Sequence, residues 1–254
     1  MRQTLSVAII TCNEEANLER TLSSVAWADE IVVVDSGSSD GTETVAHRFR
    51  CRFFREDWKG FAAQKNSALA KCTCDWILSL DADESLSDEL AREVRTLLQG
   101  SPPLDGYALS RRNLFLGRWI RFGGFYPDRK LRLFRRGAAE FEARPVHETL
   151  RFAGKAGRIA GDLVHNAYPT LEIYIAHVDR YSTLGAGVAV KERRNGLSLP
   201  SFAINVVLNP VATFIYNYFF RAGFLDGREG LLLHAYHSVY VSWKYAKAWE
   251  QARR

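Results

Sequence analysis

The first half of the chain alternates short apolar runs with segments in which apolar side chains recur every three or four residues. The apolar runs are typical of buried strands, and the periodic segments are typical of amphipathic helices. We predict strands at Leu5–Ile10, Ile31–Val34, Arg52–Phe54 and Trp76–Leu80. We predict helices between and after them at residues 14–25, 40–49, 61–70 and 87–98. Such alternation predicts an α/β fold with a doubly wound, mainly parallel sheet and right-handed crossovers.

The pattern changes after Gly106. Tyr107–Ser110 and Leu131–Phe134 have the composition of strands, and the Arg- and Gly-rich segment Arg111–Pro127 between them is predicted to be a loop. Leu171–Leu184 is predicted to be helical. We therefore expect one α/β domain over residues 1–184, with a ligand-binding half at 1–106 and a second half at 107–184. Residues 185–254 would form a helical extension.

The tail contains an uncharged stretch from Asn195 to Phe220. It is long enough to span a bilayer, which needs about 20 apolar residues. Polar residues recur in it every four positions, however, and Pro210 interrupts it, so we favour a kinked helix lying in the membrane interface. A helix packed in a protein core or in a dimer interface remains the alternative. The polar positions are Asn205, Asn209, Thr213 and Asn217, and the flanking cations are Lys191, Arg193, Arg194 and Arg221.

Composition describes a folded globular protein of 254 residues, with 47% apolar and 25% charged residues. Its four cysteines have neither zinc-ligand nor C-x-x-C spacing, so we expect reduced thiols in the cytosol. The N-terminus leads directly into the first strand, and we expect no signal peptide.

Charge is distributed unevenly along the chain. Residues 1–106 carry 11 Lys and Arg against 18 Asp and Glu, whereas residues 107–158 carry 13 against 4. A basic middle segment suggests an anionic partner: nucleic acid, phospholipid head groups or a phosphorylated substrate. A phosphorylated acceptor suits the arginines, and nucleic acid suits them less because no nucleic-acid-binding module is recognisable. The alternative is exposed surface charge and pairing with the acidic first half. The arginines concerned are Arg111, Arg112, Arg118, Arg121, Arg129, Arg132, Arg135 and Arg136.

Polar and acidic residues follow several of the predicted strands directly. Asp81 and Asp83 end the strand at Trp76–Leu80, and Asp35 ends the second strand before a loop of small residues. In open α/β sheets the ligand crevice lies at the carboxyl ends of the strands. Carboxylates placed there can hold Mg²⁺ together with substrate phosphates. Thr11, Asn13 and Glu14 end the first strand, and Lys65 could meet a diphosphate.

Three blocks of sequence closely resemble family 2 glycosyltransferases of the GT-A fold: Ser6–Glu14, Val33–Thr42 and Leu80–Glu84. Three further segments look like one branch of that family, the lipopolysaccharide-core β-1,4-glucosyltransferases that act on inner-core heptose. These segments are Arg129–Phe134, Val146–Glu148 and Gly223–Gly227.

The resemblance implies a UDP-sugar donor site and a divalent metal, Mg²⁺ or Mn²⁺. It implies that Asp83 binds the metal, that Asp81 approaches the ribose or the metal, and that His165 is a candidate third metal ligand, the alternative being a histidine satisfied in the core. The residues that would line the nucleotide pocket are Thr11, Asn13, Glu14, Asp35 and Lys65. Cys12 stands where many family members have a tyrosine, so stacking on the base would come from elsewhere or be weaker.

A catalytic base for an inverting transfer must lie near the acceptor hydroxyl, opposite the leaving diphosphate. Glu148 is the leading candidate, and Asp128 is the second. A salt bridge from Glu148 to Arg144 or Arg151 is the structural alternative.

Together these features predict a metal-dependent, inverting glycosyltransferase that moves a hexose, with glucose favoured, from a UDP-sugar to a lipid-linked saccharide. We expect it on the cytoplasmic face of the cytoplasmic membrane. Another sugar donor for cell-envelope polysaccharide or glycolipid synthesis is the first alternative. A haloacid-dehalogenase-like phosphatase, suggested by Asp81 and Asp83, and a non-catalytic saccharide-binding protein are more distant ones.

Overall fold

The computed structural model describes residues 2–143, 149–192 and 197–253. Its contacts divide the chain into two units, which are described in turn. The first unit comprises Met1–Arg112 and Asp128–Asn166, and the second comprises Asn113–Pro127 and Ala167–Arg254. The predicted boundary at residue 184 falls inside a continuous helix, α5 (Leu171–Lys191). The compact second unit therefore begins earlier than predicted and includes a segment from the middle of the chain.

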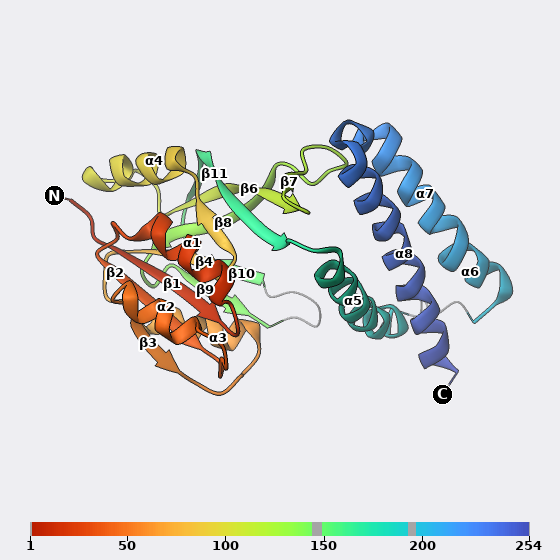
Figure 1. Ribbon diagram of the computed structural model, residues 1–254, viewed down its shortest axis with the longest axis horizontal. Helices are drawn as coiled ribbons and strands as arrows, with labels where there is room; N and C mark the ends of the chain where they lie inside the picture. The colour runs from red at the N-terminus through yellow and green to blue at the C-terminus, as the bar shows by residue number, and fades with distance from the viewer. Residues whose placement is uncertain (1, 144–148, 193–196, 254) are drawn as a thin grey trace. The chain divides into compact units, whose positions relative to one another are not determined.

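The first unit is built around a sheet whose parallel part matches the predicted strands (Figure 1). Its four parallel strands are adjacent in the order β3-β2-β1-β4. They are β1 (Leu5–Thr11), β2 (Glu30–Asp35), β3 (Arg52–Arg55) and β4 (Trp76–Asp81). Helices connect these strands, as the alternation of apolar runs and periodic segments predicted.

Beyond β4 the sheet also contains antiparallel pairs, so it is mixed rather than mainly parallel as predicted. The order continues β4-β8-β6-β11-β5, and β8 is antiparallel to both β4 and β6. No helix lies between β6 and β8, and strands joined without a crossover helix run antiparallel. Part of the predicted loop at 111–127 is also strand. These strands are β5 (Glu84–Leu86), β6 (Gly106–Phe115), β7 (Arg118–Trp119), β8 (Asp128–Arg135) and β11 (Ala156–Tyr168).

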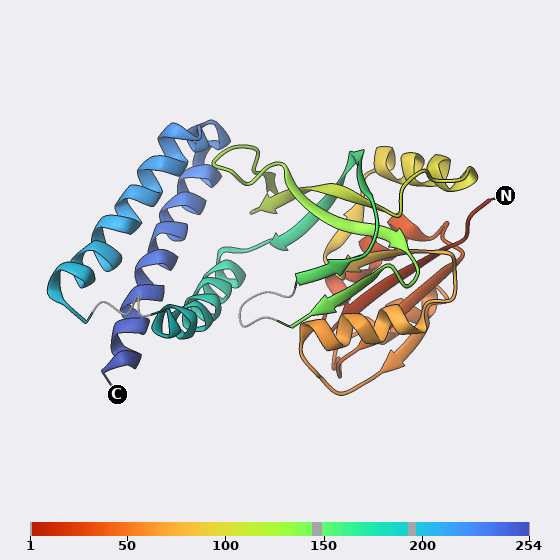
Figure 2. The same cartoon turned by 180° about the vertical axis from the view of Figure 1, so that it is seen from behind.

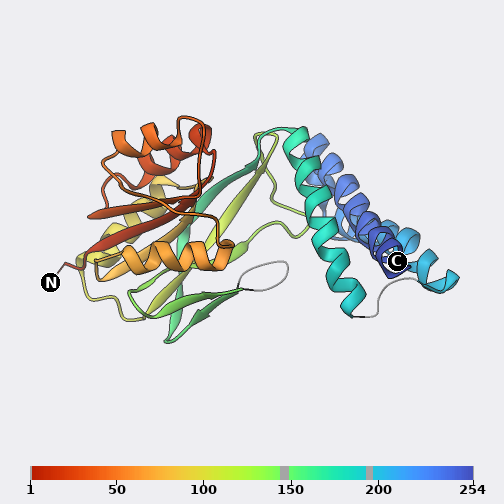
Figure 3. The same ribbon diagram turned by 90° about the horizontal axis from the view of Figure 1, so that it is seen from below.

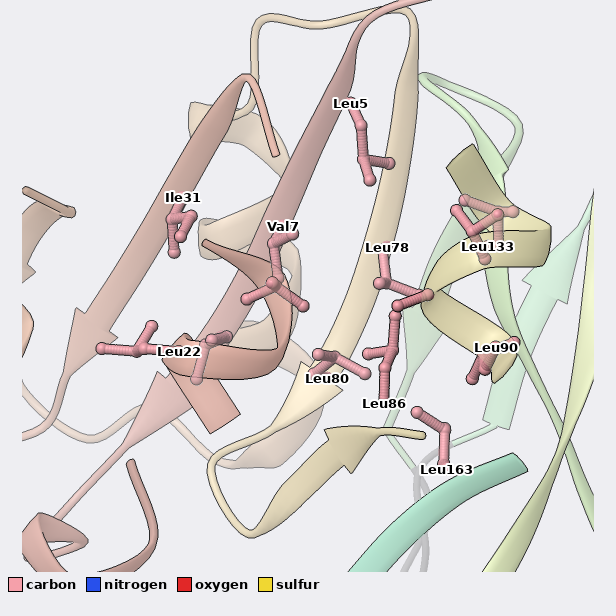
Figure 4. Packing of buried hydrophobic residues seen from close by; sticks show 14 of the residues in the cluster. Leu5, Val7, Leu22, Ile31, Leu78, Leu80, Leu86, Leu90, Leu133 and Leu163 are labelled. Atoms are coloured by element: carbon pink, nitrogen blue, oxygen red, sulfur yellow. The ribbon is translucent and has the colours of Figure 1, made fainter. Parts of the chain in front are cut away.

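Helices cover both faces of the parallel strands. One face packs against α1 (Glu15–Val25), α2 (Thr42–Arg48) and α4 (Asp88–Gln99), through the core drawn in Figure 4. Leu22 of α1 and Leu90 of α4 enter that core beside Val7 and Leu78. The other face packs against α3 (Phe61–Lys71), and Leu150 and Phe152 of a hairpin lie against the same cluster. That hairpin consists of β9 (Ala139–Glu142) and β10 (Thr149–Phe152).

The second unit is mainly helical, and it also contains the short strand β7 and the ends of β6 and β11. Helix α8 (Gly227–Ala252) packs against α5 and against the segment Leu199–Phe220, and Figures 1, 2 and 3 show it lying between them. The segment consists of α6 (Leu199–Ala203), a π-helical turn η1 (Ile204–Leu208), α7 (Asn209–Ile215) and a second π-helical turn η2 (Tyr216–Phe220). A 3-10 turn, η3 (Gly223–Asp226), leads from it into α8.

Among the described residues, Leu199–Phe220 is the one helical stretch long and apolar enough to cross a membrane. Almost none of it is buried in the protein. Length and composition alone are weak support for a span, and Pro210 lies at the start of α7, where proline is tolerated.

Candidate active site

Three strands of the first unit end at the same edge of the sheet. In the parallel register Thr11 is opposite Asp35, and Ile10 is opposite Asp81. The carboxyl ends of β1, β2 and β4 therefore bring the three predicted sequence blocks together. This is the position of the ligand crevice in open α/β sheets.

The loops after β1 and β2 are joined to each other by hydrogen bonds. Asn13 adopts a left-handed conformation with φ of 56°. Its backbone N–H donates to Ser38 Oγ over 2.8 Å, and its Oδ1 accepts from the Ser39 N–H, also over 2.8 Å. The predicted pocket residues at the ends of β1 and β2 thus form a single hydrogen-bonded rim.

Asp35 is fully buried and shapes its own loop. Its Oδ2 accepts from the backbone N–H groups of Gly37 and Ser38, each over 2.9 Å, and its Oδ1 accepts from Ser38 Oγ. Arg55 Nε lies 3.8 Å from the same Oδ2. A carboxylate has about four acceptor positions, so Oδ1 keeps one for a further donor. A direct bond from Asp35 to a nucleotide stays a prediction.

Glu14 stands among several acidic side chains. Its burial raises the pKa of the carboxyl, and Asp83, Asp40 and Asp81 raise it further, while a hydrogen bond from Asn17 opposes the shift. The Asn17 amide donates to Glu14 Oε2 over 2.9 Å. The edge of the sheet therefore concentrates negative charge, which favours the binding of a cation there.

Asp81 is held between two cations. Lys65 Nζ lies 2.7 Å from its Oδ1, and Arg132 Nη2 lies 2.6 Å from its Oδ2. Burial raises the pKa of the Asp81 carboxyl, but Arg132 and Lys65 outweigh it and hold that pKa well below its usual range. Asp81 is therefore ionised, and both of its oxygens already bind cations. The phosphatase alternative requires Asp81 to attack a phosphorus atom as a nucleophile. An aspartate with a cation on each oxygen is poorly suited to that role.

The network continues from Arg132 into the sheet. Arg132 also lies 2.7 Å from Oε1 of Glu84, which is fully buried, and Arg111 Nη1 lies 3.1 Å from the same oxygen. Arg111 Nε donates to Asp128 Oδ2 over 2.9 Å. Arg111 and Arg132 thus neutralise carboxylates of the site. For these two arginines the structure shows pairing with acidic residues, which was the alternative to binding an anionic partner.

Other members of that cluster are placed differently. Arg112 Nε lies 2.7 Å from Asp162 Oδ2, and Arg135 Nε lies 3.5 Å from Asp105 Oδ1. Arg118, Arg121, Arg129 and Arg136 are exposed. Arg118 Nη1 lies 3.6 Å from Glu229 Oε2, and Arg136 donates to the Cys74 carbonyl, so Arg121 and Arg129 are the better candidates for an anionic partner.

Asp128, the second candidate for the base, is bound to Arg111. Burial raises the pKa of its carboxyl, but Arg111 and Lys130 outweigh it and lower that pKa. A general base works best with a pKa near the working pH, so this environment makes Asp128 less suitable. Glu148, the leading candidate, lies outside the described residues, in the connection between β9 and β10.

Asp83 and His165 form the candidate metal site. His165 Nε2 lies 3.3 Å from Asp83 Oδ2. The pairing of β11 with β5 places His165 opposite Glu84, and the Asn166 N–H donates to the Asp83 carbonyl over 3.0 Å. In the part of the chain that the structure describes, no group of three His, Cys, Asp or Glu side chains could hold a metal. A carboxylate and an imidazole fit a divalent ion that completes its coordination with substrate phosphates and water.

Sequence reasoning missed the roles of Arg132 and Glu84. Arg132 lies between Leu131 and Leu133, and a charged residue within an apolar strand is a signal of a buried partner. Glu84 directly follows Asp83, but only the fold shows that its side chain turns inward to the arginines.

Comparisons with known proteins agree with this architecture. The model of glycosyl transferase family 2 matches residues 6–139. The lipopolysaccharide core biosynthesis glycosyltransferase LpsC of Rhizobium meliloti is 32% identical, over 97% of this chain and 92% of its own length. An uncharacterized glycosyltransferase of Rickettsia felis is 30% identical, over 90% of this chain and 83% of its own.

Among solved structures, the mannosyltransferase PcManGT of Pyrobaculum calidifontis, in complex with GDP-Man and Mn²⁺, superposes with a TM-score of 0.56 at 20% identity. It matches 99% of this chain and 88% of its own. At this identity the likeness supports the fold, and it confirms the predicted GT-A architecture. With the family match over residues 6–139 and the relationship to LpsC along nearly the whole chain, the protein belongs to glycosyl transferase family 2, as a glycosyltransferase with a C-terminal helical region.

Proposed function

We propose that this glycosyltransferase moves a hexose, with glucose favoured, from a UDP-sugar to a lipid-linked saccharide such as the inner-core heptose of lipopolysaccharide, with inversion. The observation that carries the proposal is the convergence of the Thr11, Asp35 and Asp81 strand ends on the Asp83–His165 pair. The relationship to LpsC supports the acceptor class.

Asp83 and His165 would hold Mg²⁺ or Mn²⁺. The bound ion would supply Lewis-acid neutralisation of the leaving diphosphate. The chain's own part is to place the two ligands, through the β5–β11 pairing, and to keep Lys65 and Arg132 on Asp81. Because both oxygens of Asp81 already contact cations, we assign Asp81 mainly to positioning the donor, and Asp83 to binding the metal.

The nucleotide would lie against the hydrogen-bonded rim at the ends of β1 and β2. Thr11 Oγ1 is buried and has no hydrogen-bond partner among the described residues. Asn13, Glu14 and Asp35 surround the same strand ends. A carboxylate there would accept from a ribose hydroxyl or a base N–H.

The acceptor hydroxyl would lose its proton to Glu148. We expect Glu148→Gln to lower the rate of transfer by about a hundredfold or more, because general base catalysis typically contributes that much. UDP binding, measured by calorimetry, should be unchanged. The matched variant Asp128→Asn should reduce transfer less. A Glu148→Gln protein with full activity would exclude this residue as the base.

A donor and acceptor screen tests the proposed function as a whole. We expect metal-dependent UDP release from UDP-glucose when a heptose-containing lipid acceptor is present. Little UDP should be released from UDP-galactose or UDP-N-acetylglucosamine, and little GDP from GDP-mannose. Preference for another donor would favour the alternative role in cell-envelope polysaccharide or glycolipid synthesis. Absence of transfer from every donor, with nucleotide still bound, would favour a binding protein.

A lipid-linked acceptor would be met at a membrane. We place the enzyme peripherally on the cytoplasmic face of the cytoplasmic membrane, with the second unit as the membrane-associating part. The exposed apolar segment Leu199–Phe220 supports this location.

A further inference from the structure

The segment Leu199–Phe220 has the reverse polarity of a helix on a water-soluble protein. Its large exposed side chains are apolar, with exposed fractions between 42% and 80%. They are Leu199, Ile204, Val207, Leu208, Val211, Ile215, Tyr216, Phe219 and Phe220. A contiguous exposed apolar face of this kind marks an interaction site.

The polar residues of the segment lie on the opposite, half-buried side and bond to one another. Asn205 Nδ2 donates to Ser201 Oγ over 3.2 Å, and Asn209 Nδ2 donates to Asn205 Oδ1 over 3.0 Å. Thr213 Oγ1 donates to the Asn209 carbonyl over 2.7 Å. The same segment packs against α8, where Ser242 Oγ donates to the Val206 carbonyl. The polar stripe thus lies on the half-buried side of the segment, whereas in an ordinary amphipathic helix of a water-soluble protein the polar side is the exposed one.

The π-helical turns explain how a stripe with a spacing of four stays on one side. In an α-helix four residues turn through about 400°, so the stripe would drift by about 40° at each step. The wider π-helical turns at η1 and η2 rotate through a smaller angle per residue, and this reduces the drift of the stripe around the helix axis.

The charges on helix α5 distinguish two orientations of the segment, one spanning the bilayer and one lying in its plane. Helix α5 packs on α8, on the side away from the segment in Figures 1 and 2, and its exposed residues include Glu172, Asp179 and Arg180. If Leu199–Phe220 crossed the bilayer, these charges would be carried to membrane depth, which is costly. If the segment lies in the plane of the membrane, α5 remains on the water side.

Cations paired with aromatic rings stand at both ends of the apolar face. The Arg221 guanidinium lies 6.0 Å from the Tyr216 ring centre at one end. At the other, Arg253 lies 4.6 Å from the ring of Trp249, which itself contacts Phe202. Aromatic rings are enriched at the membrane interface, and arginines there attract anionic head groups.

The Gly223–Gly227 motif adds a further cation at the Arg221 end. Asp226, which is 1% exposed, accepts from the backbone N–H groups of Arg121 and Phe122 over 3.1 and 2.9 Å. The Gly123 N–H donates to the Arg221 carbonyl over 2.9 Å. These bonds hold the loop Asn113–Pro127, which carries Arg121, within the second unit and join it to the backbone of Arg221.

We propose that the second unit docks in the plane of an anionic bilayer, with the apolar face of Leu199–Phe220 in the hydrocarbon and with Arg121 and Arg221 on lipid phosphates. The inference deepens the membrane location proposed above and rests on it. The row of cations at the edges of an uncharged face favours a lipid surface over a second copy of the chain.

Vesicle co-sedimentation of the full chain tests the proposal. Wild-type protein should bind vesicles of phosphatidylglycerol and phosphatidylcholine, and Val207→Glu with Val211→Glu should bind at least about tenfold more weakly, because charge on the inserted face is costly. The matched control is Leu184→Glu, on the exposed side of α5, which should bind as the wild type does. Arg121→Gln and Arg221→Gln should each weaken binding to the anionic vesicles by about fivefold and leave binding to pure phosphatidylcholine unchanged.

Circular dichroism and UDP binding should be the same for all variants, which separates failure of docking from failure of the proposed enzyme function. Full vesicle binding by the Val207→Glu/Val211→Glu protein would overturn the proposal. So would a wild-type dimer in sedimentation velocity that this variant converts to a monomer, since the face would then be an interface between copies.

Discussion

Replacing Asp83 with asparagine is expected to reduce sugar transfer by about a thousandfold. The substitution keeps the size of the side chain but removes the charge that would hold the metal beside His165. Lewis-acid stabilisation by a bound metal contributes several kcal/mol, and each ~1.4 kcal/mol changes a rate about tenfold. The measurement is the rate of UDP release at several Mn²⁺ and Mg²⁺ concentrations, with a lowered apparent metal affinity expected for the variant.

The matched control for Asp83→Asn is Asp57→Asn, at an exposed position between β3 and α3, which should transfer sugar at the wild-type rate. His165→Ala should lie between the two, because loss of a neutral ligand leaves the carboxylate in place. Activity in the Asp83→Asn protein that responds to metal as the wild type does would contradict the assignment of Asp83 as a metal ligand.

Replacing Arg132 with methionine is expected to lower the free energy of unfolding by about 3–5 kcal/mol, the usual cost of removing one partner from a buried charge network. Arg132 is 5% exposed and binds both Asp81 and Glu84, which would each lose a cation in the interior. For a chain of this size the loss corresponds to a melting temperature lower by about 10 °C. Thermal denaturation followed by circular dichroism gives the result directly.

Arg129→Gln, on the same strand but exposed, serves as the comparison and should leave the melting temperature within about 2 °C. If Arg132→Met melted at the wild-type temperature, Asp81 and Glu84 would have to be neutralised by other groups. The network would then not be a main source of stability in the first unit.

The parallel half of the sheet could be predicted because its signals are local. Strands β1, β2 and β4 are short apolar runs, and helices connect the four parallel strands. Right-handed crossovers then bring Thr11, Asp35 and Asp81 to one edge. Position along the chain was enough to group the nucleotide-binding candidates before their contacts were known.

The remainder of the site depends on pairings between distant segments. His165 reaches Asp83 because β11 pairs with β5, and Arg132 reaches Asp81 because β8 pairs with β4. No local pattern specifies such partners or their register. The same limitation applied to the tail, where the spacing of Asn205 and Asn209 identified a stripe but not the side on which α8 would cover it.

The loop Asn113–Pro127 belongs to the second unit although it interrupts the first in sequence. The backbone N–H groups of Arg121 and Phe122 in this loop donate hydrogen bonds to the Asp226 carboxylate, which lies more than a hundred residues further along the chain. A shortened protein ending after Asn166 would thus leave this loop without the carboxylate that orders it. The second unit therefore cannot be separated from the first by a single cut in the sequence.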